Sequence, residues 1–190
     1  ANMLLRRYGR AIGVEPGFTI LDRGDAEDLI ALMRSQLGLN EKDKRFPRKG
    51  TIGEIFSKAE NTLRSLDDIV LEEFSHFADH LDALGQLQKG YQAAKRQRQL
   101  ADYDDLLVLL RRLLTEDQHA REMISQLYRY ILVDEYQDTN RLQADVIRML
   151  AFTHQNVMVV GDDSQSIYAF RGATFKNIME FPTLFPGTTI

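Results

Sequence analysis

The sequence contains no cysteine, which excludes disulfide bonds and thiolate metal ligands. This absence is compatible with a reducing compartment, and we expect a cytoplasmic protein. No apolar run approaches the roughly 20 residues that a membrane-spanning helix needs, and the N-terminus has no apolar signal segment. We therefore expect no membrane partner. With 44% hydrophobic residues in 190, the chain can still bury a core, in one large domain or two small ones.

Basic charge is scarce in the second half of the chain. Residues 1–101 carry 16 basic and 15 acidic side chains, whereas residues 102–190 carry 8 and 13, within a net charge of −4. An acidic half suits a cation site better than a surface that binds phosphates by bulk charge. Any nucleic-acid binding must therefore depend on stacking and on local basic patches. The candidate phosphate-binding patches are residues 42–49 and residues 95–98. A solvated loop is the alternative for the first patch, and a solvated helix end is the preferred interpretation of the second.

Apolar residues at helical spacing dominate the chain up to about residue 127. We expect Asp25 to cap a helix that runs to Gly38, and Thr51 to begin a mostly helical stretch interrupted near Asp67 and at Gly90. The predicted helices cover residues 3–12, 25–38, 52–100 with those interruptions, 104–114 and 120–127.

The pattern changes after Tyr128. Two short apolar runs, residues 130–133 and 157–160, flank an amphipathic helix at residues 142–150. Strand, helix and strand in this order are typical of a parallel βαβ unit. We therefore predict a helical region followed by an α/β segment. The chain begins inside a helical pattern at Ala1 and stops just after residues 185–187, so we expect a piece of a longer protein.

Acidic residues follow both predicted strands. Asp134 and Glu135 come directly after the first strand, and Asp162 and Asp163 follow Gly161 after the second. Since parallel strands place their carboxyl ends at one edge of a sheet, these residues predict a polar crevice there. Paired carboxylates can hold a hydrated divalent cation and polarise a water. The alternative is that Asp134 or Asp138 only caps the following helix.

The residues after Gly161 combine three chemistries. Gln165 is an amide that can sense a phosphate oxygen or a catalytic water, while Tyr168, Phe170 and Arg171 offer aromatic faces and a cation to a single-stranded nucleic acid. The alternatives are core packing for the two aromatic residues and an ion pair for Arg171.

Four strings in the sequence carry a resemblance to a known family. Residues 130–140 and 159–173 resemble motifs II and III of UvrD/Rep-type superfamily 1 DNA helicases. Residues 102–107 (DYDDLL) resemble the short motif before that family's chain re-enters its motor core, and residues 18–22 resemble the entry to its inserted helical subdomain. One departure is Phe170, where the family commonly has the more strongly stacking Trp.

The resemblance implies a fold and a division of the chain. The expected fold is α/β: part of a P-loop (RecA-like) parallel sheet with a large inserted all-α subdomain. Residues 1–14 would end a motor-core segment, residues 15–101 would form the inserted subdomain, and residues 102–190 would return to the motor core with motifs II and III.

It also implies roles for individual residues. Asp134 would bind Mg²⁺ at an ATP site, Glu135 would be the catalytic base, and Gln165 would couple the γ-phosphate of ATP to the DNA site. Contacts to DNA would come from Tyr168, Phe170, Arg171 and Tyr103. The implied activity is ATP-driven movement along single-stranded DNA and unwinding of forked duplex, in DNA repair or replication, together with a second motor domain.

The phosphate-binding pattern G-x-x-x-x-G-K-[ST] is absent from these 190 residues. The resemblance places this loop upstream and the second motor domain downstream, so we expect negligible ATP hydrolysis by this chain alone. Two alternatives stay open. One is a non-catalytic module that binds single-stranded DNA or docks a partner; the other is a two-metal nuclease or polymerase site at Asp134, Glu135, Asp162 and Asp163.

Overall fold

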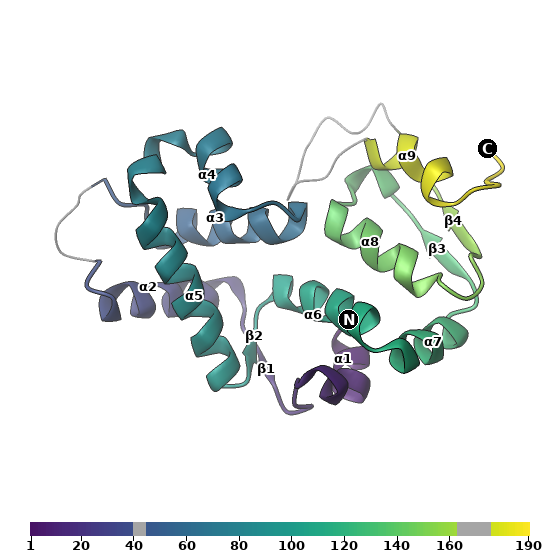
Figure 1. Ribbon diagram of the computed structural model, residues 1–190, viewed down its shortest axis with the longest axis horizontal. Coiled ribbons are helices and arrows are strands. Elements are labelled where there is room, and N and C mark those ends of the chain that lie inside the picture. The colour runs from purple at the N-terminus through teal and green to yellow at the C-terminus, as the bar shows by residue number, and fades with distance from the viewer. Residues whose placement is uncertain (40–44, 163–175) are drawn as a thin grey trace. The chain divides into compact units, whose positions relative to one another are not determined.

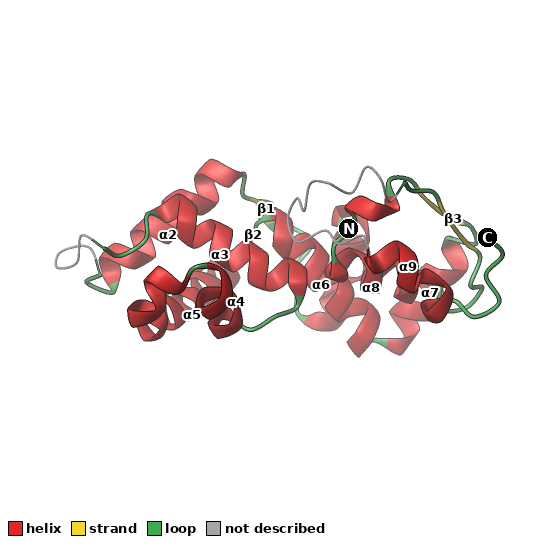
Figure 2. Cartoon of the chain, turned by 90° about the horizontal axis from the view of Figure 1, so that it is seen from above, coloured by secondary structure: helices red, strands yellow, loops and turns green. Residues whose placement is uncertain are grey.

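The computed structural model describes residues 1–39, 45–162 and 176–190. Within these ranges the chain is mostly helical and contains two small parallel sheets (Figures 1 and 2). It divides into two compact units: a helical unit, Gly17–Leu106, and a two-segment unit made of Ala1–Pro16 and Leu107–Ile190. None of the described helices has the length and apolar character needed to cross a membrane.

In the described part of the helical unit there are four α-helices, one 3-10 helix and two very short strands, and a further α-helix, α6 (Tyr103–Glu116), begins in it. In chain order these elements are β1 (Thr19–Ile20), α2 (Arg23–Gln36), α3 (Lys49–Thr62), α4 (Leu66–Glu73), the 3-10 helix η2 (Ser75–His80), α5 (Leu81–Gln97) and β2 (Leu100–Ala101).

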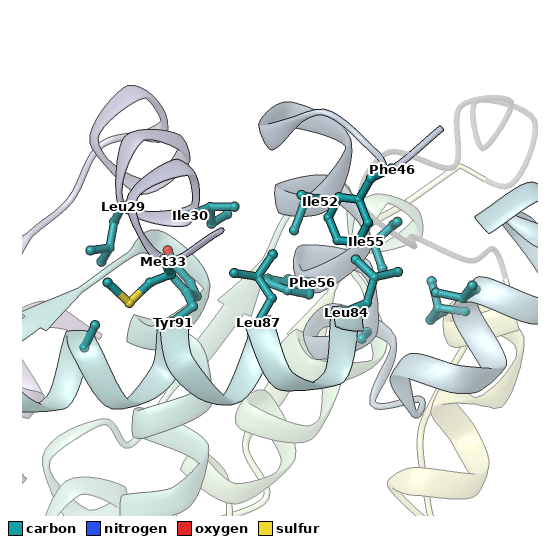
Figure 3. Packing of buried hydrophobic residues seen from close by; sticks show 14 of the residues in the cluster. Leu29, Ile30, Met33, Phe46, Ile52, Ile55, Phe56, Leu84, Leu87 and Tyr91 are labelled. Carbon is teal, nitrogen blue, oxygen red and sulfur yellow. The ribbon is translucent and has the colours of Figure 1, made fainter. Parts of the chain in front are cut away.

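The core of the helical unit lies between α2, α3, α4 and α5. Figure 3 shows side chains from α2, α3 and α5 converging on one another. They sit on one face of each helix at three- and four-residue spacing, which is why the sequence pattern predicts helices here. The labelled core residues are Leu29, Ile30, Met33, Phe46, Ile52, Ile55, Phe56, Leu84, Leu87 and Tyr91.

Several predicted helix boundaries move in the structure. Asp22, rather than Asp25, caps α2, because its Oδ1 accepts a hydrogen bond of 2.8 Å from the Asp25 backbone N–H. The expected break near Asp67 is real, since Leu63 adopts a left-handed conformation (φ 56°) and Ser65 caps α4. Gly90 does not interrupt α5, whose buried face offsets the low helix propensity of one glycine.

Strands β1 and β2 pair in parallel, with Thr19 opposite Leu100 and Ile20 opposite Ala101. The expectation of an entirely α-helical segment at residues 15–101 is wrong in this detail. The pairing arises because the extended residues on either side of the helices satisfy each other's backbone groups. It also places the two ends of the helical unit next to each other.

A buried ion cluster lies beside this small sheet. The Lys95 ammonium is 2.6 Å from Asp102 Oδ2 and 2.6 Å from Asp105 Oδ2, and the Tyr91 hydroxyl donates to Asp102 Oδ2 at 2.8 Å. Burial acts to raise the pKa of Asp102, but Lys95 more than offsets this effect and holds that pKa below its usual value. Lys95 is only 2% exposed, so its part in a phosphate-binding patch at residues 95–98 is excluded.

The two-segment unit contains strand, helix and strand in the predicted order. Its sheet pairs β3 (Ile131–Val133) with β4 (Val157–Val159) in parallel, which confirms the predicted βαβ unit. Its other elements are α1 (Asn2–Tyr8), the 3-10 helix η1 (Gly9–Ile12), the second part of α6, α7 (Gln118–Leu127), the 3-10 helix η3 (Tyr136–Asp138), α8 (Arg141–Leu150) and α9 (Lys176–Leu184). Helix α9 was not predicted from the sequence.

Among the residues that the structure describes, the β3–β4 sheet is covered on one face only. Ile131, Val133, Val157 and Val159 pack against a cluster that includes Tyr136, Phe181 and Phe185, whereas the alternate residues Leu132 and Met158 are 71% and 56% exposed. Figure 1 shows the two strands side by side next to α8 and α9. Period-two alternation therefore separates a packed face from an open apolar one.

We predict that Lys95→Met lowers the free energy of unfolding by about 3–5 kcal/mol, because it leaves two largely buried carboxylates without their counter-ion. Urea denaturation of the chain measures this change. The matched control is Lys89→Met on the exposed side of the same helix, which should change stability by less than about 0.5 kcal/mol. Equal effects of the two substitutions would contradict the prediction.

Candidate nucleotide site at the carboxyl edge of the β3–β4 sheet

The acidic residues predicted to share one sheet edge do so for the described part of the chain. Val133 lies opposite Val159, so Asp134 and Glu135 leave β3 beside the point where Gly161 and Asp162 follow β4. Backbone hydrogen bonds continue past the strands, from Val160 N–H to Val133 O (2.8 Å) and from Tyr136 N–H to Val160 O (2.9 Å). The parallel pairing therefore brings two segments more than 20 residues apart to one place.

Asp134 is exposed at this edge. Its Oδ1 accepts a hydrogen bond of 3.0 Å from the Glu135 backbone N–H, which fixes the carboxylate against the turn. The alternative role as a helix cap is wrong for both Asp134 and Asp138. Helix α8 is capped by Asn140, whose side chain accepts from Gln143 N–H while Gln143 accepts from Asn140 N–H.

Glu135 has a left-handed backbone (φ 50°, ψ 44°), which is uncommon for a residue other than glycine. This conformation turns the chain sharply from β3 into η3. Residues held in such sparsely populated conformations are frequent at functional sites, where the surrounding structure maintains them. The side chain is exposed at the sheet edge and is available to a ligand.

Gln137 is a site residue that the sequence reasoning missed. Its side chain is 2% exposed, its Nε2 donates to Glu135 Oε2 at 2.6 Å, and its Oε1 accepts from the Asp162 backbone N–H at 3.0 Å. One buried amide thus links the candidate base to the exit of β4. The only available signal was its position between two acids in the string DEYQD.

Gly161 is required for space. A Cβ at this position would lie 2.6 Å from Gln137 Oε1 and 2.9 Å from Ile178 Cδ1, which is closer than any side chain tolerates. The absence of a side chain at Gly161 lets the chain pass directly over the buried amide.

Tyr136, which is fully buried, holds the turn after β3 in place through its packing. Its ring packs edge-on against Phe181 of α9, with 5.5 Å between ring centroids. Burial raises the pKa of the Tyr136 hydroxyl, for which the described residues provide no hydrogen-bond partner. Apolar contact therefore holds Tyr136, and with it the backbone between Glu135 and Gln137.

Most of the remaining predicted site residues lie outside the part of the chain that the structure describes. Gln165, Tyr168, Phe170, Arg171 and Asp163 lie outside the described residues. Tyr103 is the first residue of α6, belongs to the helical unit and is 53% exposed. Of the first basic patch, Lys42 and Lys44 lie outside the described residues, and the Lys49 ammonium is 2.5 Å from Asp28 Oδ1.

The exposed carboxylates are chemically suited to magnesium. Mg²⁺ prefers oxygen ligands and is usually held by one or two carboxylates, with water and substrate phosphates completing its shell. Asp134 fits this use, because only its Oδ1 takes part in the turn. Among the described residues, no group of three or more histidine or acidic side chains could hold a metal ion, so those residues do not form an all-protein two-ion site.

The sheet edge, its acidic residues and the accompanying helices define a known class of protein. The chain belongs to the UvrD/REP helicase family, because the model of the UvrD/REP helicase N-terminal domain matches residues 1–186. Among individual proteins, it is 36% identical over 184 residues to ATP-dependent DNA helicase PcrA of Staphylococcus epidermidis, and 34% identical to PcrA of Staphylococcus aureus. These matches cover 96% of this chain but only 24% of each relative, so the chain spans about a quarter of their length.

We predict that Gly161→Ala destabilises the chain by about 1–3 kcal/mol, since the added methyl group overlaps Gln137 and Ile178. Unfolding in urea tests this. The matched control is Gly85→Ala within α5, where a Cβ meets nothing within 4 Å; it should stabilise the chain by about 0.5–1 kcal/mol. Tolerance of Gly161→Ala would show that the amide is not held against the strand.

Proposed function

We propose that this chain supplies the water-activating part of the ATP site in a longer ATP-dependent DNA helicase. The observation that carries the proposal is the exposed Asp134–Glu135 pair, held at the carboxyl edge of a parallel sheet and bonded through Gln137 to the exit of the neighbouring strand. The name of the relatives, ATP-dependent DNA helicase PcrA, supports the same activity.

Asp134 and Glu135 have different roles in this proposal. Asp134 would hold Mg²⁺, which would supply positive charge at the phosphates of ATP. Glu135 accepts a proton from a water molecule as the water oxygen attacks the γ-phosphorus. The bond to the β–γ bridging oxygen breaks, and ADP and inorganic phosphate leave. Gln165 senses the γ-phosphate.

One feature of the fold supports a RecA-like P-loop motor core that is completed by the rest of the longer protein. Parallel sheets of this class are covered on both faces, and the exposed Leu132 and Met158 leave one face of the β3–β4 sheet open for further elements. We propose that further strands and helices of the longer protein complete this sheet and provide the phosphate-binding loop. We also propose that residues 15–101 form an inserted subdomain. The parallel pairing of β1 with β2 supports this, because an insertion needs adjacent entry and exit strands.

The proposed DNA contacts come from residues near the start and near the end of residues 102–190. Tyr103, Tyr168, Phe170 and Arg171 stack on or pair with single-stranded DNA, which is consistent with the acidic charge of this half of the chain. Unwinding of forked DNA requires a second motor domain of the same protein. We propose a cytoplasmic protein that acts in DNA repair or replication.

In the full-length protein, Glu135→Gln should lower ATP turnover at least about 100-fold while ATP and single-stranded DNA still bind, because the amide keeps the shape of the base but cannot accept the proton. Steady-state hydrolysis and equilibrium nucleotide binding measure the two quantities. The control is Glu116→Gln at the exposed end of α6, which should leave turnover unchanged. A wild-type rate in Glu135→Gln would contradict the assignment of the base.

Tyr103→Ala should weaken single-stranded DNA binding by the full-length protein about 10-fold or more, since stacking of one base on an aromatic ring contributes about 1–3 kcal/mol. Fluorescence anisotropy with a labelled oligonucleotide measures the affinity. Tyr130→Ala is the matched control: this tyrosine is 79% exposed but has no proposed DNA role. Equal losses in the two variants would argue against a specific contact at Tyr103.

A further inference from the structure

The side-chain amide of Gln137 has one possible orientation. The Asp162 backbone N–H can only donate, so it must face the amide oxygen, and the ionised Glu135 carboxylate can only accept, so it must face the amide nitrogen. The amide is therefore polarised from both ends. It connects an exposed side chain to a backbone group across the sheet edge.

Burial makes this link rigid. Gln137 is 2% exposed, Gly161 lies directly against its Oε1, and the fully buried Tyr136 precedes it in the chain. A buried amide that loses either hydrogen bond has an unsatisfied polar group, which is unfavourable by about 1–3 kcal/mol. Glu135, in contrast, is exposed and has its own rotamer freedom, so the amide is the element that restricts it.

We infer that Gln137 is a positioning residue for the base Glu135. By holding Oε2 of the carboxylate at 2.6 Å, it leaves Oε1 to accept the proton, and it ties this geometry to the exit of β4 through Asp162 N–H. In this role Gln137 acts through Glu135 and not by direct contact with nucleotide or water. The inference rests on the proposed function, since Glu135 must be the base for its position to affect turnover.

Two substitutions separate positioning from simple structural support. Gln137→Glu keeps an oxygen for Asp162 N–H, but its ionised form replaces the donor with a carboxylate that repels Glu135. Its protonated form can still donate to Glu135, so the positioning role is lost only in the ionised form. Gln137→Met keeps the length of the side chain and removes both hydrogen bonds.

In the full-length protein, both variants should lower kcat for DNA-stimulated ATP hydrolysis about 10- to 100-fold, as expected for a misplaced catalytic group, while KM for ATP changes less than about 3-fold. The matched control is Gln143→Glu, which keeps the acceptor for Asn140 N–H in the α8 cap and should retain wild-type kcat. A wild-type kcat in Gln137→Met would overturn the inference.

A double-mutant cycle provides a second measurement. If Gln137 acts through Glu135, adding Gln137→Met to Glu135→Gln should lower the single-turnover hydrolysis rate by less than about 2-fold, because the base whose position Gln137 sets is already gone. A full multiplicative loss would show that Gln137 acts elsewhere and would overturn the inference.

Folding and the proposed function are checked separately. Melting temperatures identify any variant that does not fold, in which case the other variant decides; failure of both to fold would make Gln137 a structural residue and overturn the inference. If Glu135→Gln hydrolyses ATP at the wild-type rate, the proposed function fails and the inference falls with it. If Glu135→Gln is inactive and Gln137→Met is not, only the inference fails.

Discussion

The parallel pairing of β3 with β4 is the constraint on which the candidate site depends. Its register sets Val133 opposite Val159, so the acidic turn after β3 and the strand exit after β4 meet at one edge. A slip of one residue would turn Ile131 and Val133 away from Tyr136 and its neighbours and expose them. The same hydrogen bonds therefore fix both the packing against the sheet and the chemistry at its edge. Helix α8, which is capped independently by Asn140, connects the two strands.

The helical unit is stabilised by different means. Its core consists of aliphatic and aromatic side chains from the packed helices. The paired strands β1 and β2 and the Lys95 cluster further stabilise this unit. Buried ion pairs contribute little net stability but strongly penalise the loss of one partner. Because Asp102 and Asp105 also bond to each other's backbone N–H groups at the start of α6, the cluster sets where the chain leaves this unit.

Elements with a strong period could be predicted from the sequence, and so could the acidic sheet edge, because strand alternation and strand order are local patterns. What failed depended on contacts between distant residues. The sequence around Lys95 predicts a solvated basic residue, whereas the structure places Asp102 and Asp105 beside it. Gly90 alone predicts a helix break, whereas the packed face of α5 keeps the helix continuous. Asp22 and Asp25 are equally good caps by residue type, and only backbone geometry distinguishes them. Gln137 was missed because burial of an amide is a tertiary property.

The same tertiary property explains how an exposed carboxylate can serve as a defined base. An isolated glutamate on a turn samples several rotamers, and ordering it costs side-chain entropy of about 1.5–2 kcal/mol. At this edge that entropy is opposed by a hydrogen bond to a charged acceptor, worth about 1.5–3 kcal/mol, from an amide that is itself immobilised by burial and by Asp162 N–H. The two terms are of similar size, so the geometry of Glu135 depends on both ends of the link. A shift in the exit of β4 would therefore be transmitted to the carboxylate through Gln137.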